Sequence, residues 1–313
     1  MKIRIRFQLA PGDMWCFTAF LKDFCTQHPE HQIEFNTFFP EVYLNNPNFH
    51  YLRSDPDMDF KFTFQDVCGL KRWRFGNTKT PENMVQCLYD FVEKKTGIHT
   101  ERKTFFVDWY PTENEKKLSV FSPEKPVCLV NASYKDDNKN KFWGSEKFQA
   151  VIDALKDKVL FVQVGAKESY FNHTSRLKNC QNMIGQTNLR ELAHLVYHAD
   201  FVLTGISQLL PLSAIQTYKP RHCITIAGAR EPEQWANCWK QHNVTFHWIG
   251  NNADFLSCME TIPNRQEKPG CWLHECDKTP SPCMEAIKPE PIIQIFEEVL
   301  NEHGKKVSEN QGE

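Results

Sequence analysis

The chain has 313 residues, a formal net charge of -2, 41% hydrophobic residues and 24% charged residues. This is an ordinary globular composition, and the length suits about two domains of roughly 150 residues each. The near-neutral charge and the lack of a long basic block argue against nucleic acid as a main partner. No apolar run reaches the roughly 18 residues that a membrane-spanning helix needs.

Two features bear on the cellular compartment. The first residues, MKIRIRFQLA, alternate charged and apolar side chains and lack the continuous apolar stretch of a secretory signal peptide. The 12 cysteines are mostly single residues within apolar segments, which is typical of reduced core thiols rather than of a disulfide scaffold. We therefore expect a soluble, cytoplasmic protein with no transmembrane segment, for which peripheral contact with a membrane stays open.

The N-terminal third begins with a strand-helix unit. Residues 2-10 alternate apolar and basic side chains and predict a strand, which Pro11-Gly12-Asp13 interrupts. Apolar side chains at helical spacing then predict a helix over about 13-27, with Asp13 favoured at its N-terminus by capping and by the helix dipole. A strand at 32-38, apolar pieces around 49-52 and 59-64, and a helix at 81-96 closed by Gly97 are expected to follow.

The polar segment 111-127 contains Pro111, Pro123 and Pro126 and predicts a domain linker. Beyond it, strands and helices alternate regularly, which predicts a parallel sheet with right-handed crossovers. The expected strands cover 127-132, 159-164, 200-204, 222-227 and 244-249, and the expected helices 145-156, 188-198, 208-218, 231-242 and 289-303. The chain thus divides into domains at 1-120 and 121-303 and a mobile polar tail at 304-313.

Two α/β domains joined by a linker enclose a cleft, and ligands of open α/β sheets bind beyond the carboxyl ends of the strands. The loops expected to carry function are therefore 11-14, 131-144, 165-175, 204-208 and 228-234. The chain contains no P-loop, no G-x-G-x-x-G fingerprint and no G-x-S-x-G elbow, so the common cofactor and hydrolase motifs are not supported.

Several segments in the same order resemble glycosyltransferase family 9, the ADP-heptose:lipopolysaccharide heptosyltransferases. Residues 10-21 (APGDMWCFTAFL) resemble the family's N-terminal glycine-aspartate-helix element. Residues 127-155 resemble its first donor-domain strand-loop-helix, including a lysine shortly before a tryptophan. Residues 184-205, 224-235 and the region from Cys283-Met284 into the last helix are similar to later family elements, so the resemblance spans about 1-300.

The resemblance implies a GT-B fold, in which two Rossmann-like domains face a central cleft. Residues 1-120 would bind the acceptor and residues 121-303 the sugar nucleotide. The implied activity is an inverting transfer of a sugar, of the heptose class, from an ADP-linked donor to a saccharide or protein hydroxyl. The implied context is lipopolysaccharide biosynthesis, and no metal cofactor is required for catalysis.

Asp13 is the candidate catalytic residue. The acceptor hydroxyl must lose a proton as it attacks the anomeric carbon, and a carboxylate at the cleft suits that general-base role. Local sequence alone makes Asp13 a helix cap; the resemblance favours the catalytic interpretation.

The candidate donor-binding residues belong to the second domain. Lys141 matches the family's phosphate-contacting lysine, although a solvated surface lysine is the alternative. Asn131 and Ser133 follow a strand and either face the nucleotide or close a turn. Backbone amides at the start of helix 208-218 would hold a phosphate through the helix dipole. The remaining candidates in this region are Gly205, Ser207, Gln208 and Arg230, while Glu191 is expected to cap its helix.

The expected donor loop, which follows Gly205 and extends to Pro211, departs from the family pattern. Family members commonly have Asp-[Ser/Thr]-Gly followed by His, whereas this chain has Ile206, Ser207, Gln208 and Pro211. The departure leaves three possibilities open: a different donor, weaker donor binding, or loss of activity. Two alternatives to the heptosyltransferase function remain. One is a non-catalytic binding or assembly protein on a degenerate GT-B scaffold, and the other is another GT-B sugar-nucleotide enzyme.

Four cysteines near the C-terminus form a possible metal site. Cys258, Cys271, Cys276 and Cys283 lie within 26 residues, and four soft ligands suit a structural zinc or iron ion. The resemblance adds that some protein heptosyltransferases carry a cysteine-bound metal finger in this region. The spacing contains no tight C-x-x-C pair, so reduced thiols and a disulfide remain alternatives.

Overall fold

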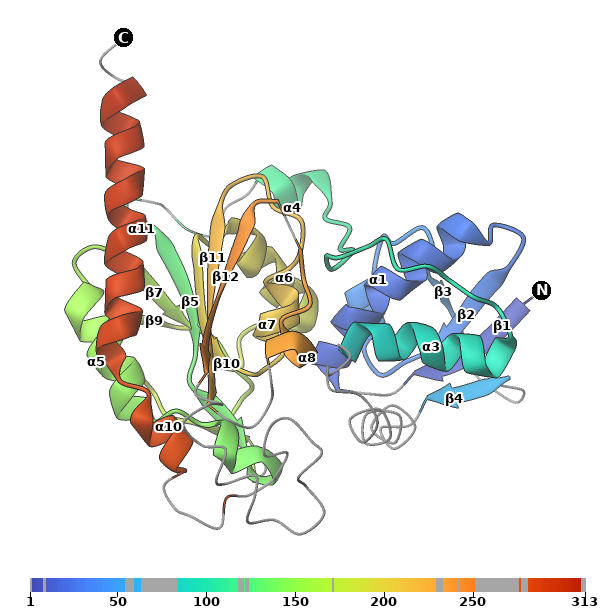
Figure 1. The fold of residues 1–313 in the computed structure, drawn as a ribbon, viewed down its shortest axis with the longest axis horizontal. Helices are drawn as coiled ribbons and strands as arrows, with labels where there is room; N and C mark the ends of the chain where they lie inside the picture. Colours follow the sequence, from blue (N-terminus) through green and yellow to red (C-terminus); the bar gives the residue numbers. More distant parts are fainter. Residues whose placement is uncertain are drawn as a thin grey trace.

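The computed structural model describes residues 2-7, 10-53, 59-62, 84-117, 121, 124-170, 172-228, 233-240, 242-250, 276 and 281-310. Two α/β units make up this part of the chain, each built around a parallel sheet (Figure 1). We call them the N-unit, which contains β1 to α3, and the C-unit, which contains β5 to α11. Among the described helices, none combines the length and the apolar character needed to cross a membrane.

The N-unit sheet has the strand order β3-β2-β1-β4, and each pair is parallel. Its strands are β1 (Lys2–Phe7), β2 (Gln32–Asn36), β3 (His50–Tyr51) and β4 (Phe60–Phe62). The helical elements are α1 (Pro11–Gln27), the 3-10 turn η1 (Pro40–Tyr43) and α3 (Met84–Thr96). Gly97 follows α3 with φ of +73°, a conformation that favours glycine, as expected at the end of this helix.

Helix α1 begins two residues earlier than expected. The carbonyl of Ala10 accepts from the amides of Asp13 and Met14 at 2.9 and 3.2 Å, and Pro11 supplies a helical φ at the first position. Ala10 is therefore the N-cap residue, and Asp13 lies within the first turn. The expectation that Asp13 caps the helix, and that 11-14 is a loop, is wrong.

The C-unit sheet has the order β12-β11-β10-β5-β7-β9 with parallel pairing throughout, which confirms the parallel sheet expected from the strand-helix alternation. Its strands are β5 (Val127–Asn131), β7 (Leu160–Gln163), β9 (Gln181–Asn182), β10 (Phe201–Gly205), β11 (Arg221–Gly228) and β12 (Val244–Gly250). The longer helices are α5 (Ser145–Leu155), α6 (Leu189–His198) and α11 (Pro289–Asn310), with α10 (Pro282–Ala286) before α11. Helix α11 continues to Asn310, so residues 304-310 of the expected polar tail are helical.

Alternating side chains of the central strands fill two apolar layers. On β5, Cys128 and Val130 belong to the core that contains α5 and α11, whereas Val127 and Leu129 belong to the core that contains α6. Figure 1 shows α5 and α11 together on one side of the sheet. Because both faces are covered, every residue of β5 is buried, and its first four residues, Val127 to Val130, are a continuous apolar run.

Helix α7 (Leu209–Leu212) is much shorter than the helix expected at 208-218. The guanidinium of buried Arg221 donates to the carbonyl of Ser213 at 2.9 Å, and the amide of Val107 donates to the carbonyl of Ala214 at 3.0 Å. These two carbonyls therefore accept hydrogen bonds from donors that are distant in sequence and not from the amides four residues ahead. The helix ends for this reason.

Helix α8 (Glu233–Ala236) is also shorter than the helix expected at 231-242. The carbonyl of Cys238 accepts from Arg102 Nη2 at 3.0 Å, and the amide of Lys240 donates to Phe105 at 2.9 Å. Hydrogen bonds to the segment that leaves the N-unit thus replace those that would extend the helix.

The described part of the segment that joins the two units makes hydrogen bonds to both of them. It contains α4 (Glu113–Lys117), and Glu115 accepts from Arg190 Nη2 at 2.7 Å. The same guanidinium donates to Leu44 of the N-unit and to Tyr110, so it ties α6 to both. The boundary at 120/121 falls beside residues outside the described ranges and stays a prediction.

Candidate functional site

The carboxyl ends of β5 and β10 meet at one edge of the C-unit sheet. These strands are neighbours, with Asn131 opposite Thr204, so Asn131 and Gly205 end them side by side. After β5 the chain forms β6 (Ser133–Lys135) and the 3-10 segment η2 (Asp136–Lys141). Strand β6 pairs antiparallel with β8 (Asn172–Thr174), which lies in the loop after β7.

Ser133 is held firmly at this edge. Its amide donates to Asn131 Oδ1 at 2.9 Å, and its hydroxyl accepts from Thr174 Oγ1 at 2.9 Å. A Cβ on Gly165 would come within 2.6 Å of that hydroxyl oxygen, so only glycine leaves room for it. The turn-closing role of Asn131 is therefore real, and a nucleotide contact by either residue stays a prediction. Both residues lie in the loop 165-175 that the sequence predicted to carry function, but neither was predicted as a site residue, although a glycine directly after a buried strand was an available signal.

Lys141 lies beside the donor loop. Its carbonyl oxygen is 3.1 Å from the position that a Cβ on Gly205 would take, so a side chain at 205 would press on η2. Gly205 thus allows the close approach of the Lys141 backbone to the end of β10. Lys141 itself is half-buried.

Hydrogen bonds within the donor loop fix Ser207 just after Gly205. Ser207 Oγ shares a hydrogen bond with buried Thr204 Oγ1 at 2.8 Å and accepts from the amide of Leu209 at 3.2 Å. A phosphate site based on the dipole of helix 208-218 was expected here. Because α7 has only four residues, that helix-dipole argument is wrong, and Ser207 and Gln208 remain candidates through their own polar groups.

The first turn of α1 lies against this donor loop. A Cβ on Gly12 would be 3.4 Å from the Cα of Gln208 and 3.8 Å from Cγ of Pro211. The same turn is fixed from within the N-unit, because Tyr43 Oη donates to the carbonyl of Met14 at 3.0 Å. Half-buried Asp13 therefore directly follows a glycine that lies close to the donor loop of the other unit.

The remaining predicted site residues are Arg230 and the four cysteines of the possible metal site. Arg230, Cys258 and Cys271 lie outside the described residues. Cys276 and Cys283 are half-buried, and Cys283 Sγ is 3.2 Å from the Cβ position of Gly228 at the end of β11. In the part of the chain that the structure describes, no group of three or more His, Cys, Asp or Glu residues is arranged to hold a metal ion. The four-cysteine zinc or iron site stays a prediction.

Glu191 caps α6, as expected. The side chain of Asn188 accepts from the amide of Glu191 at 2.9 Å, and Glu191 Oε2 accepts from the amide of Asn188 at 2.8 Å. This reciprocal pair is a capping box, which satisfies two amides at the start of the helix. Glu191 therefore has a structural role.

With this geometry established, comparisons with known proteins identify the family. The profile of glycosyltransferase family 9 (heptosyltransferase) matches residues 67-258, more than half of the chain. No match was found among curated protein sequences.

Solved structures of the same family have the same fold. A family 9 glycosyl transferase from Veillonella parvula is 13% identical with a TM-score of 0.59, and the match covers 96% of this chain and 97% of that one. E. coli ADP-heptose LPS heptosyltransferase II is 12% identical with a TM-score of 0.55, over 97% and 100% of the two chains. The iron-containing dodecameric glycosyltransferase TibC from enterotoxigenic E. coli is 13% identical with a TM-score of 0.60, over 96% and 76%. The chain therefore has the GT-B fold and belongs to glycosyltransferase family 9, the heptosyltransferase family.

Proposed function

We propose that the protein transfers a sugar of the heptose class from an ADP-linked donor to a hydroxyl group of a saccharide or protein acceptor, with inversion at the anomeric carbon. Family membership supports the sugar-transfer chemistry. The choice of donor is supported by a similar structure, TibC, which is described in complex with ADP-D-beta-D-heptose.

One observation carries the proposal for the site. Gly12, the neighbour of Asp13, lies so close to the donor loop that an added Cβ would be only 3.4 Å from the Cα of Gln208. An inverting transfer needs a base beside the acceptor hydroxyl and positive or hydrogen-bonding groups beside the departing diphosphate. The proximity of the two units at this point supports such an arrangement, in which Asp13 would act on the acceptor side and Ser207, Gln208 and Lys141 on the donor side.

In the proposed reaction, Asp13 removes the proton from the acceptor hydroxyl as the oxygen bonds to the anomeric carbon. The bond between that carbon and the donor phosphate oxygen breaks, and the nucleoside diphosphate leaves with the electron pair. A carboxylate base of this kind contributes about 10²- to 10⁴-fold to the rate. Lys141, Ser133 and Ser207 would stabilise the charge on the leaving diphosphate, with no catalytic metal ion required.

Replacement of Asp13 by asparagine tests the general base. We expect D13N to lower kcat for release of ADP from ADP-heptose by about 10²- to 10⁴-fold, because the amide cannot accept the proton. The affinity for ADP, measured by calorimetry, should stay within about twofold, since Asp13 acts on the acceptor. The matched control is D90N, which changes an aspartate of α3 that is bound to Gln86 and lies outside the site.

Two results would contradict the proposal in different ways. Full transfer activity in D13N would show that another group removes the proton. A thermal-shift screen with ADP, GDP, UDP, CMP and their sugars tests the donor, because a ligand that binds the native state raises the melting temperature. Stabilisation by another nucleotide and not by ADP would overturn the ADP-linked donor.

A further inference from the structure

The strand pair β6-β8 joins the loops that follow β5 and β7 at the carboxyl edge of the C-unit sheet. Ser133 pairs with Thr174 and Tyr134 with His173. The imidazole of His173 stacks on the ring of Tyr134, with centroids 4.9 Å apart. This imidazole is thus next to the polar groups that fix Ser133.

Each ring nitrogen of His173 faces a carboxylate. Nε2 is 3.1 Å from Asp136 Oδ1, and Nδ1 is 3.2 Å from Glu168 Oε1. A neutral imidazole has a single N–H and can donate to one of them, whereas the imidazolium donates to both. The hydrogen bond to Asp136, with a smaller contribution from Glu168, raises the pKa of His173. The protonated form is therefore the one that suits this arrangement.

The two carboxylates belong to different parts of the site. Glu168 Oε2 also accepts from the amide of Thr174 at 2.7 Å, so Glu168 is fixed to β8. Asp136 is the first residue of η2, whose last residue is Lys141. The backbone of Lys141 in turn lies against Gly205 of the donor loop. His173 thus anchors one end of the short segment 136-141, and the other end carries the candidate phosphate ligand.

We propose that protonated His173 is the positioning residue of the segment 136-141, and that it sets where Lys141 lies relative to the diphosphate of the donor. The role deepens the proposed function and rests on it for the identity of the ligand. It predicts that a nucleoside diphosphate binds more tightly when His173 is charged.

The groups around His173 determine the pH range over which the anchoring of segment 136-141 is expected to change. Among the side chains that the structure describes, the carboxylates of Asp136 and Glu168 face the imidazole, and the ring of Tyr134 stacks on it. Lys139 is paired with Asp136 at 3.4 Å. Carboxyl, ammonium and phenol groups ordinarily titrate far from neutrality, so the imidazole is the group that changes charge there. Because the pKa of His173 is raised, the anchoring is complete below the ordinary histidine value of about 6.5 and is lost as the pH rises through the raised pKa.

The expected change in nucleotide affinity depends on how exposed the ion pair between His173 and Asp136 is. The side chains of His173 and Asp136 are 30% and 34% exposed, so solvent and salt screen the ion pair. We therefore expect a change of about two- to fivefold in nucleotide affinity, which is the range of a partly exposed pair.

The experiment compares wild type with H173Q, which is neutral at every pH, and H173K, which stays charged. Amide exchange of residues 136-141 is measured by mass spectrometry at about pH 6 and about pH 8.5, comparing variants at the same pH. We expect faster exchange in H173Q than in wild type at the lower pH and no difference at the higher pH, with H173K protected at both. The matched control is H99Q, which removes another exposed histidine-carboxylate pair, His99 with Glu93, from the N-unit.

Calorimetry with ADP at the same two pH values supplies the functional measurement. H173Q and H173K do not change charge between the two pH values, so any change in their affinity for ADP reports the titration of the nucleotide itself. When the pH is raised, the affinity of wild type should fall by about two- to fivefold more than that of either variant. Equal exchange of 136-141 in wild type and H173Q, or the same pH response in all variants, would overturn the role of His173. Failure of wild type to bind ADP at either pH would instead reject the ADP donor, while the exchange data would still decide whether His173 anchors the segment.

Discussion

Asp23 shows how a single buried charge organises the N-unit. It lies on α1 with 4% of its surface exposed, and its carboxylate accepts four hydrogen bonds. The donors are Tyr89 Oη at 2.7 Å, the amides of Lys103 and Thr104 at 2.7 and 2.8 Å, and Thr104 Oγ1 at 2.7 Å. Burial and the adjacent Asp23 raise the pKa of Tyr89, which keeps its hydroxyl as a donor. One side chain thereby fixes α3 and the segment 103-104 to α1.

The substitution D23N tests this network. An amide nitrogen would face hydrogen-bond donors in place of one carboxylate oxygen, and we expect the free energy of unfolding to fall by about 2 to 3 kcal/mol. Urea denaturation of the full chain measures the change. D90N, which changes a half-buried aspartate of α3 that accepts from Gln86, should stay within about 0.5 kcal/mol of wild type. Equal midpoints for the two variants would mean that the four hydrogen bonds add little net stability.

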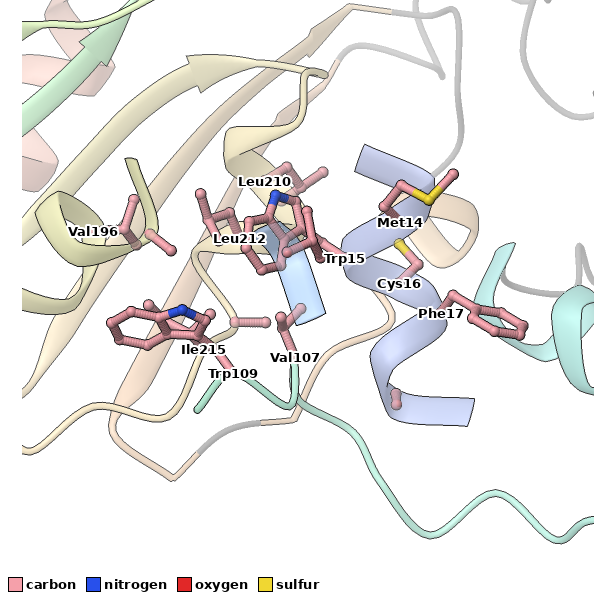
Figure 2. Packing of buried hydrophobic residues seen from close by; sticks show 14 of the residues in the cluster. Met14, Trp15, Cys16, Phe17, Val107, Trp109, Val196, Leu210, Leu212 and Ile215 are labelled. Carbon is pink, nitrogen blue, oxygen red and sulfur yellow. The ribbon is translucent and has the colours of Figure 1, made fainter. Parts of the chain in front are cut away.

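At the scale of elements, the contact between α1 and α7 decides the geometry of the site. The four residues of α7 are buried, and Leu210 and Leu212 lie beside Trp15 of α1 (Figure 2). Gly12 lets the first turn of α1 approach Gln208 without a side chain between them. The loop that contains Gln208 and Pro211 is thus part of the apolar contact between the two units.

Substitution of Gly12 probes this contact. In G12A the added Cβ would be 3.4 Å from the Cα of Gln208, an ordinary contact, so stability and activity should stay close to wild type. G12V adds two further methyl groups in the same direction and should move Asp13 away from the donor loop. We expect kcat to fall by about tenfold or more, since misplacement by about 1 Å can reduce catalysis about 10²-fold. Steady-state kinetics of both variants measure the difference, and wild-type kcat in G12V would argue that this contact does not position Asp13.

At the scale of the whole molecule, the two units share one apolar core. The same cluster contains Phe20 and Phe35 of the N-unit and Leu129 and Val202 of the C-unit. Figure 2 shows the region where they meet, in which Val107 of the joining segment forms a parallel β-bridge with Ile215. Shared burial couples the stability of the two units, so we expect the chain to unfold as one cooperative body.

Trp15, which is fully buried at this junction, tests the coupling. We expect W15A to lower the unfolding free energy by about 3 to 5 kcal/mol and to shift a single transition, because the cavity weakens the core of both units. W15F should cost less, since it keeps most of the packing and removes an indole N–H that finds no hydrogen-bond partner within the described ranges. Fluorescence and far-ultraviolet circular dichroism should give coincident curves in urea. Two separated transitions in wild type would contradict the coupling.

Local patterns in the sequence determined the elements that depend on local forces. Gly97 ends α3 because a positive φ suits glycine, and Asn188 with Glu191 caps α6 through groups three residues apart. The regular alternation of strands and helices after residue 127 predicted a parallel sheet, because a helical crossover returns the chain to run parallel with the preceding strand. The order of the family-like segments also predicted the GT-B fold, which the structural comparisons bear out.

Only the tertiary structure decided where α7 ends and what lies beside Asp13. The carbonyls after Leu212 accept from Arg221 and Val107, donors that no local pattern brings to them. Likewise, Gly12 meets Gln208 and Asp136 meets His173 across long stretches of chain. Hydrogen bonds within a helix or turn depend on neighbours in sequence, whereas these contacts depend on how the sheets and the two units pack, and so the sequence alone did not contain them.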